Sequence, residues 1–174
     1  IDSVLFITNE HKLGNIDNMI DHARYKGAFG EMGLAINNLV QDHINTTTQA
    51  VDVMQQYSKG NFTVDMARLP GKRGQITAAL DGVKKNLVDM QSEITMLVDS
   101  ALAGNLSARA NITTFEHSYR DMVNGINGLL DAITSPLAVA ASYVERIAHG
   151  DIPEKITTSY LGDFNTIKDN LNRC

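Results

Sequence analysis

Five histidines and one cysteine are the side chains of this sequence best suited to catalysis or metal binding. Zinc sites usually space paired ligands regularly, as in His-Glu-x-x-His or Cys-x-x-Cys. No two of these histidines stand four residues apart, and the single cysteine ends the chain, so no internal disulfide can form. The residues are His11, His22, His43, His117, His149 and Cys174. Their spacing predicts no metal, no cofactor and no catalytic site.

The segment "PGKRG" is the other chemical candidate, because it places Lys72 directly after a glycine, as phosphate-binding loops do. A P-loop also needs a glycine six residues before that lysine, and the residue there is Met66. We therefore interpret the segment as a solvated turn.

Composition limits the class of protein. The 174 residues are 43% hydrophobic but only 6% aromatic, without Trp, which suits narrow helix–helix seams better than one large core. The net charge of -5 argues against nucleic acid as a partner. The aliphatic run "VLFI" near the start is far too short to insert into a membrane. Because the sequence begins without Met and ends within a pattern, we expect a fragment of a longer protein.

A triplet of Gly, then Asn or Asp, then an apolar residue occurs four times, at spacings of 46, 44 and 46 residues. Such a constant period indicates internal repeats. The triplets begin at Gly14, Gly60, Gly104 and Gly150, which we call the corner glycines. A glycine commonly ends a helix, because it enters the left-handed conformation freely. The repeat therefore predicts four helix ends.

Apolar residues at steps of three and four lead up to each corner glycine, and a second such stripe starts 14–16 residues after it. Stripes of this period are typical of coiled-coil helices. Each repeat is thus predicted as helix, connector, helix. The predicted bundle core comprises Ile7, Phe29, Met32, Ile36, Leu39, Ala50, Met54, Tyr57, Ile76, Leu80, Val83, Leu87, Ile94, Leu97, Ala101, Tyr119, Met122, Ile126, Leu129, Ala140, Val144, Ile147, Phe164, Ile167 and Leu171.

His11 stands on the first stripe, at the position that Tyr57, Ala101 and Ile147 occupy in the other repeats. A histidine there could form a pH-sensitive packing layer. A histidine that is satisfied by a hydrogen-bond partner is the interpretation that we favour.

The connectors are longer than the two to eight residues that join antiparallel helices. A 16-residue helix is about 24 Å long, and a dozen extended residues span roughly 40 Å. The connector can therefore return along the first helix and start the second helix parallel to it. Its apolar residues would pin it to the helices; the predicted anchors are Ile16, Phe62, Leu69, Leu106, Ile112, Ile152 and Ile156.

Four modules follow from this pattern: residues 1–43, 44–90, 91–134 and 135–174. The stretches 30–59 and 75–103 contain no proline, so the second helix of one module is expected to continue into the first helix of the next. The junction before module four differs, because Pro136 lacks an N–H and Ser135 is a good N-cap. A kink or break is therefore predicted near residues 133–136.

Two amphipathic helices cannot bury both of their stripes against each other. A second copy of the chain can supply the missing half, which gives a parallel four-helix bundle for each module. The alternative is a monomeric solenoid in which each module stacks on the next. The burial argument favours the homodimer, so the predicted fold class is all-α, with tandem bundles joined by fused helices.

The order helix, Gly-x-apolar connector, helix resembles the HAMP domain, a signal-relay module of bacterial sensors. The resemblance covers nearly the whole chain as four modules. It is sharpest in the fourth, which has Pro136 at the head of its first helix, the corner 150–152 and an acidic-apolar-small start at 163–165. The equivalent starts at residues 28–30 and 118–120 lack the acidic residue.

The fused helices look like the poly-HAMP arrays of methyl-accepting chemoreceptors. The resemblance implies a cytoplasmic, non-catalytic relay in a parallel homodimer. Its neighbours in the full chain would be a sensor domain, with PAS as one candidate, and a methyl-accepting output domain. The alternatives are a HAMP array that regulates a sensor histidine kinase, a passive coiled-coil spacer, which would not need connectors, and a ligand-binding bundle, which would need an inward-facing polar cluster.

Overall fold

The computed structural model describes all residues, 1–174, and its only regular elements are helices. They are α1 (Asp2–Lys12), α2 (Ala28–Ser58), α3 (Gly74–Leu102), α4 (His117–Ala148) and α5 (Gly162–Leu171). Short 3-10 turns, His22–Arg24 and Gly71–Arg73, precede α2 and α3. The predicted all-α fold class is confirmed. None of the helices is both long and apolar enough to cross a lipid bilayer.

The chain divides into two compact units, Ile1–Lys85 and Asn86–Cys174, and the division falls within α3. The first unit holds the connectors 13–27 and 59–73, and the second holds the connectors 103–116 and 149–161.

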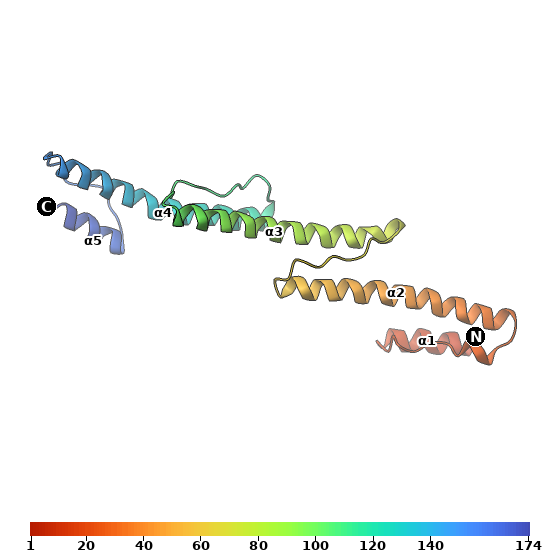
Figure 1. Cartoon of the computed structure of the whole chain (residues 1–174). Coiled ribbons are helices and arrows are strands. Elements are labelled where there is room, and N and C mark those ends of the chain that lie inside the picture. Colours follow the sequence, from red (N-terminus) through yellow and green to blue (C-terminus); the bar gives the residue numbers. More distant parts are fainter. The chain divides into compact units, whose positions relative to one another are not determined.

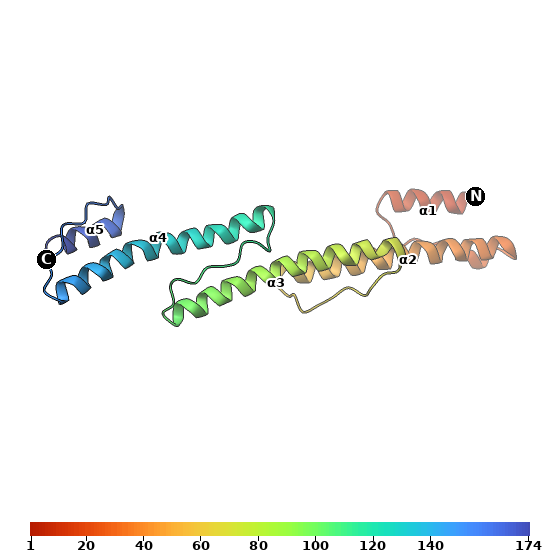
Figure 2. The same cartoon turned by 90° about the horizontal axis from the view of Figure 1, so that it is seen from above.

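The connector of each module runs back along the first helix, so the second helix starts near the beginning of the first and runs in the same direction. Figure 1 shows this return most plainly between α1 and α2 and between α4 and α5. Figure 2 shows the same course from above. The connectors thus make the paired helices parallel, as their length predicts.

The core of the first unit forms where the second connector lies over its helix pair. Val53 and Tyr57 of α2 pack there with Leu80 of α3 and with Met66 of the connector. The Tyr57 ring also meets the ring of Phe62, with centroids 6.0 Å apart. The connector is therefore part of the core and not a loose loop.

The second unit repeats this arrangement around the third connector. Leu97 of α3 and Val123 of α4 pack with Ala110 and Phe115 of the connector. Phe115 and Val123 are 1% and 0% exposed. Complete burial of such side chains contributes about 1.5–3 kcal/mol each, so this connector contributes much of the unit's stability.

α2 and α3 each serve two modules, as the proline-free stretches predict. α2 has 31 residues and α3 has 29, both much longer than an average helix. Gly33 is buried, and a Cβ there would lie 3.1 Å from the Cβ of His22. The absence of a side chain at Gly33 therefore lets the first connector pack closely against α2.

The predicted break at residues 133–136 is wrong. α4 continues from His117 to Ala148 with Pro136 inside it, and Ser135 is an exposed helical residue, not an N-cap. A proline inside a helix costs about 3 kcal/mol or more. Packing on both sides offsets that cost, because Ile126 and Leu130 join the core before Pro136 and α5 contacts α4 after it.

Candidate functional site

The four corner glycines all end helices in the left-handed conformation. Their φ angles are 92° at Gly14, 78° at Gly60, 82° at Gly104 and 78° at Gly150. At each corner the glycine N–H donates to the carbonyl three residues back, and the next N–H donates to the carbonyl five residues back. This is the Schellman arrangement, which satisfies the last carbonyls of the helix. The chain therefore leaves all four helices along equivalent paths.

In three of the four modules the corner Asn or Asp side chain bonds back to the helix that it leaves, whereas Asn105 in module three accepts from Ser107. In modules one and two, Asn15 and Asn61 donate from Nδ2 to Glu10 Oε2 and to Gln56 Oε1, both at 2.8 Å. In module four the polarity is reversed, because Arg146 Nε donates to Asp151 at 2.7 Å. This bond lowers the pKa of the Asp151 carboxyl below its ordinary value.

An asparagine side chain on the second helix holds the connector of module one. Asn37 Nδ2 donates to the carbonyl of Ile20 at 2.8 Å, and the Ile20 N–H donates to Asn37 Oδ1 at 2.9 Å. Ile20 stands six residues after the corner glycine and is 5% exposed. The asparagine therefore bonds both backbone groups of a buried connector residue, whose carbonyl also accepts from the His22 N–H at 2.8 Å.

We call this pair of bonds the connector clamp, and it recurs in two further modules. Asn127 holds Ala110 with bonds of 2.9 and 2.8 Å, and Asn172 holds Ile156 with bonds of 3.1 and 2.7 Å. Ala110 and Ile156 also stand six residues after their corner glycines. The clamp fixes the connector register on the second helix, so the connector cannot slide without breaking two hydrogen bonds.

The connector carbonyl four residues after each corner glycine is also bonded, by a different side chain in every module. His11 Nε2 donates to Asn18 O at 3.0 Å, and Tyr57 donates to Val64 O at 3.3 Å. The other two donors are Arg109 Nη1 to Ala108 O at 2.6 Å and Tyr143 to Glu154 O at 3.0 Å. Burial raises the pKa of Tyr57, while Lys84 opposes that shift.

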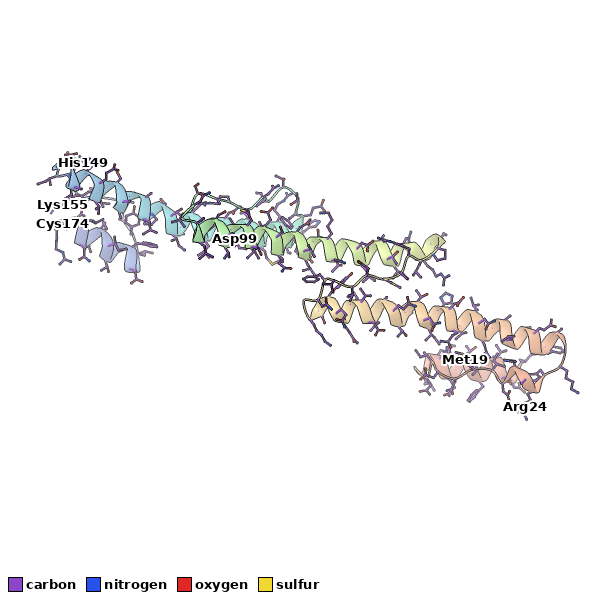
Figure 3. All side chains as sticks on the ribbon, viewed as in Figure 1. Met19, Arg24, Asp99, His149, Lys155 and Cys174 are labelled. Atoms are coloured by element: carbon purple, nitrogen blue, oxygen red, sulfur yellow. The ribbon has the colours of Figure 1, made fainter.

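His11 is therefore a histidine with a hydrogen-bond partner, which agrees with the favoured interpretation of its position. His149 lies at the C-terminal end of α4, with Nδ1 2.8 Å from the carbonyl of Glu145 (Figure 3). No three His, Cys, Asp or Glu side chains come together as metal ligands.

The predicted connector anchors fall into two groups. Phe62, Leu69, Ile112 and Ile156 are partly buried. Ile16, Leu106 and Ile152 are 41%, 43% and 82% exposed and do not pin the connector within the single chain. The buried position is instead the one six residues after the corner glycine, where Ile20, Met66 and Ala110 stand. In module four Pro153, next to Ile152, is the buried residue.

Two segments of the chain match family models. Residues 114–174 match the HAMP domain, and residues 46–88 match the HAMP N-terminal domain 3. The chain therefore contains HAMP domains, in the segments 46–88 and 114–174. It is similar to the methyl-accepting chemotaxis protein McpB of Pseudomonas aeruginosa, with 40% identity over 81 residues, which are 47% of this chain and 12% of that relative. The match thus spans about an eighth of that relative's length.

The HAMP module at residues 46–88 holds its connector differently from the other three. Lys84 occupies the place of the clamp asparagine, eight residues after the first apolar residue of the second stripe. Its Nζ lies 2.7 Å from Asp65 Oδ1 and 3.3 Å from the carbonyl of Val64. Lys84 is 23% exposed and Asp65 is 65% exposed. An ion pair that reaches solvent thus replaces a neutral clamp.

Each of the four connectors has a second residue with positive φ at or near its end. Gly27, Gly71 and Gly162 have φ between 56° and 57°, whereas module three has His117 there with φ 47°. A residue with a Cβ is strained in this conformation by about 1–2 kcal/mol. Module three is therefore the one module in which the connector end carries backbone strain.

Most predicted bundle-core residues are not buried within one chain. Ile7, Tyr57, Leu80 and Leu97 are buried, whereas Phe29 is 70% exposed and Leu129 is 60% exposed. Other exposed members of the set are Met32, Leu39, Met54, Ile76, Val83, Ile94, Ala101, Met122, Val144 and Ile167. The partly buried members are Ile36, Ala50, Leu87, Tyr119, Ile126, Ala140, Ile147, Phe164 and Leu171. An apolar stripe therefore remains uncovered in each of the four modules.

Three features of the site were not predicted from the sequence. They are the asparagines of the clamp, the buried residue six positions after the corner glycine, and the burial of Phe115. A signal for the clamp exists, since Asn37, Asn127 and Asn172 follow their corner glycines by 23, 23 and 22 residues. Phe115 also has a signal, because Tyr25 and Tyr160 stand, as Phe115 does, four residues before the first apolar residue of their second stripe.

Proposed function

We propose that this HAMP region transmits conformational change, without catalysis, between a sensor domain and a methyl-accepting output domain. The observation that best supports this proposal is the apolar stripe that each helix–connector–helix module leaves exposed. The full protein would work in the cytoplasm, with a sensor, for which PAS is one candidate, on the input side. Modules one and three are proposed as HAMP modules because the clamp of Asn37 and Asn127 is the same as in module four.

A second copy of the chain is the proposed partner for these stripes. In module two the stripes of α2 and α3 line a shallow apolar recess of about 780 Å³, with Val51, Met54, Ile76 and Leu80 on its walls. Contiguous exposed apolar surface of this kind marks an interaction site. Because both helices of a module are parallel and present similar residues, a twofold-related copy can fill each recess with the same side chains. The product is a parallel four-helix bundle.

Such a bundle can relay a signal if it has two packings of similar free energy. Small residues such as Ala50, Ala101 and Ala140 alternate with Ile and Leu along the stripes, which allows helices to rotate, tilt or shift in register. An input that favours one packing by a few kcal/mol biases the population of the whole module. α2 and α3 each belong to two modules and so carry that bias without a flexible loop.

Disulfide crosslinking tests both the dimer and the relay. In a Cys174→Ser background, Met54→Cys places a thiol on the uncovered stripe, whereas Asp52→Cys places one on an exposed polar position of the same helix. Interchain crosslinks should form much faster at position 54 than at position 52, and the rate should change with the stimulus. Equal rates at both positions, or a monomer of about 19 kDa at tens of micromolar in sedimentation, would contradict the dimer. Identical rates with and without stimulus would contradict the relay.

The alternative output is a sensor histidine kinase, which the same dimer would serve. The sequence after Cys174 distinguishes them, because a chemoreceptor continues as a long Glu/Gln-rich helical hairpin and a kinase continues with a phospho-acceptor histidine helix. A passive spacer is less well supported, because a plain coiled coil would not need four connectors held to their helices by side-chain bonds.

A further inference from the structure

Arg109 is the most highly bonded side chain of the four connectors. Its Nε and Nη2 donate to Asp131 Oδ1 at 2.9 and 2.6 Å, and Nη2 also reaches Thr134 Oγ1 at 3.3 Å. Its Nη1 donates to the connector carbonyls of Leu106 and Ala108 at 2.8 and 2.6 Å. The guanidinium thus makes three hydrogen bonds to α4 and two to connector carbonyls, and the bonds to Asp131 are charge-assisted.

The α4 end of these hydrogen bonds lies directly before the one proline inside a helix. Asp131 and Thr134 precede Pro136 by five and two residues. Pro136 has no N–H, so the carbonyl of Ala132 lacks its usual partner in the helix, and bending is easiest there. Arg109 therefore holds the helical turn beside the weakest point of α4.

The part of α4 after Pro136 belongs to module four. Tyr143 donates to the carbonyl of Glu154 in the fourth connector, and α5 packs on the same stretch. A change of direction at Pro136 would move this stretch together with its connector. The bonds of Arg109 to α4 and Pro136 thus lie at the junction of modules three and four, which share this helix.

Module two offers a comparison within the same chain. Arg68 of its connector pairs with Asp81 of α3, but it reaches no connector carbonyl and is 75% exposed. Arg109 is 29% exposed, and no proline interrupts α3. The Arg68 pair is an ordinary surface ion pair, which has little structural effect.

We propose that Arg109 is a positioning residue that couples the third connector to the α4 segment around Pro136 and thereby to module four. A displacement of the carbonyls of residues 106–108 pulls on Asp131 and Thr134 through the rigid guanidinium. The missing hydrogen bond at Pro136 lets that pull redirect residues 137–148. The role in signalling rests on the relay proposed above, whereas the mechanical coupling does not.

Hydrogen exchange of the full-length protein tests the coupling with four proteins: wild type, Arg109→Gln, Pro136→Ala and the double variant. Arg109→Gln should raise exchange in residues 137–148 about three- to ten-fold when Pro136 is present. In the Pro136→Ala background the same change should leave residues 137–148 unaltered, although exchange in the connector still rises. Arg68→Gln is the matched control and should not affect residues 137–148.

An equal increase in both backgrounds would overturn the proposal, because Arg109 would then be only a stabilising residue of module three. An increase confined to residues 103–116 would overturn it as well. Receptor output, measured on the same variants, separates this inference from the proposed function. If hydrogen exchange changes but receptor output does not, the mechanical coupling stands and the relay is contradicted. If the receptor relays its signal but exchange in residues 137–148 does not change, the relay stands and the coupling is contradicted.

Discussion

Asn127 and Ala110 stand 17 residues apart in the sequence and pair through two hydrogen bonds, one in each direction. The side-chain amide of Asn127 presents one donor and one acceptor side by side, which matches the N–H and C=O of a single residue. The clamp therefore supplies the extended connector with the kind of backbone hydrogen bonds that a strand obtains from a neighbouring strand, although no sheet is present. It also joins the connector to the second helix and leaves the apolar stripe free.

Asn127→Leu tests the clamp. The change leaves the N–H and C=O of Ala110 unpaired in a largely buried position, so the free energy of unfolding should fall by about 1–3 kcal/mol. Asn124→Leu, at an exposed position on the same helix, is the control and should change it by less than about 0.5 kcal/mol. Urea denaturation measures both values, and equal losses would show that the pairing is not the cause.

Lys84→Asn tests the ionic substitute in module two. Because Asp65 reaches solvent, salt should screen its pairing with Lys84, and hydrogen exchange in residues 61–69 should accelerate about two- to five-fold between low and 1 M NaCl. The asparagine variant should lose this salt dependence, since a neutral amide is not screened. The first connector, held by Asn37, serves as the internal control. A salt response of the same size in both connectors would argue against the distinction.

Gly60→Val should damage the second corner. Gly60 has φ 78°, and a β-branched residue there stores strain, so we expect a loss of about 1–3 kcal/mol. Gly82→Ala on α3 is the matched change at a glycine with open space around it, and should add up to ~1 kcal/mol through helix propensity. Thermal unfolding compares the two. An unchanged melting temperature for Gly60→Val would refute the corner assignment.

His117→Gly should stabilise module three. Glycine removes the strain at φ 47°, and the extra freedom of the unfolded chain offsets only part of that gain, which leaves up to about 1 kcal/mol. Ser118→Gly, one residue further into α4, should instead destabilise by about 0.5–1 kcal/mol. Chemical denaturation that shows a loss for both variants would mean that His117 makes a contact worth more than the strain.

The stability of module four should depend on pH through Asp151 at its corner. The hydrogen bond from Arg146 lowers the pKa of the Asp151 carboxyl, so the carboxylate stabilises the folded state above its unfolded pKa near 3.8. That contribution is lost as the pH falls through the folded value. NMR titration of the carboxyl should show the lowered pKa in the wild type and a return toward the ordinary value in Arg146→Gln. A pKa unchanged by Arg146→Gln would contradict this origin.

The helices and corners were predictable because their signals are local and repeated. A stripe at steps of three and four, followed by a glycine, needs no knowledge of distant contacts, and Gly14 and Gly150 carry the same signal 136 residues apart. The connector packing was less predictable. Ile152 reads as an anchor in sequence, yet it is 82% exposed and Pro153 is the buried residue, at a position that no constant spacing from the corner marks.

The junction at Pro136 shows the opposite limit of sequence reasoning. Local propensity favours a break there, and it was outweighed by packing on both sides, which involves residues as distant as Ala110 and Leu171. The clamp asparagines were hidden for a similar reason. Asn37 looks like an ordinary polar helix residue until its partner Ile20 is known.

The sharing of α2 and α3 between modules has a consequence for how such a chain can grow. A gene duplication whose boundaries lie in the middle of two shared helices would copy one complete module. The copy would join its neighbours through continuous helices, so no new loop or terminus would arise. The next corner glycine follows the first apolar residue of the second stripe by 31 residues in α2 and α4 but by 28 in α3, a difference of about 300° around a helix. A duplicated module would therefore bring its own angular phase into the array.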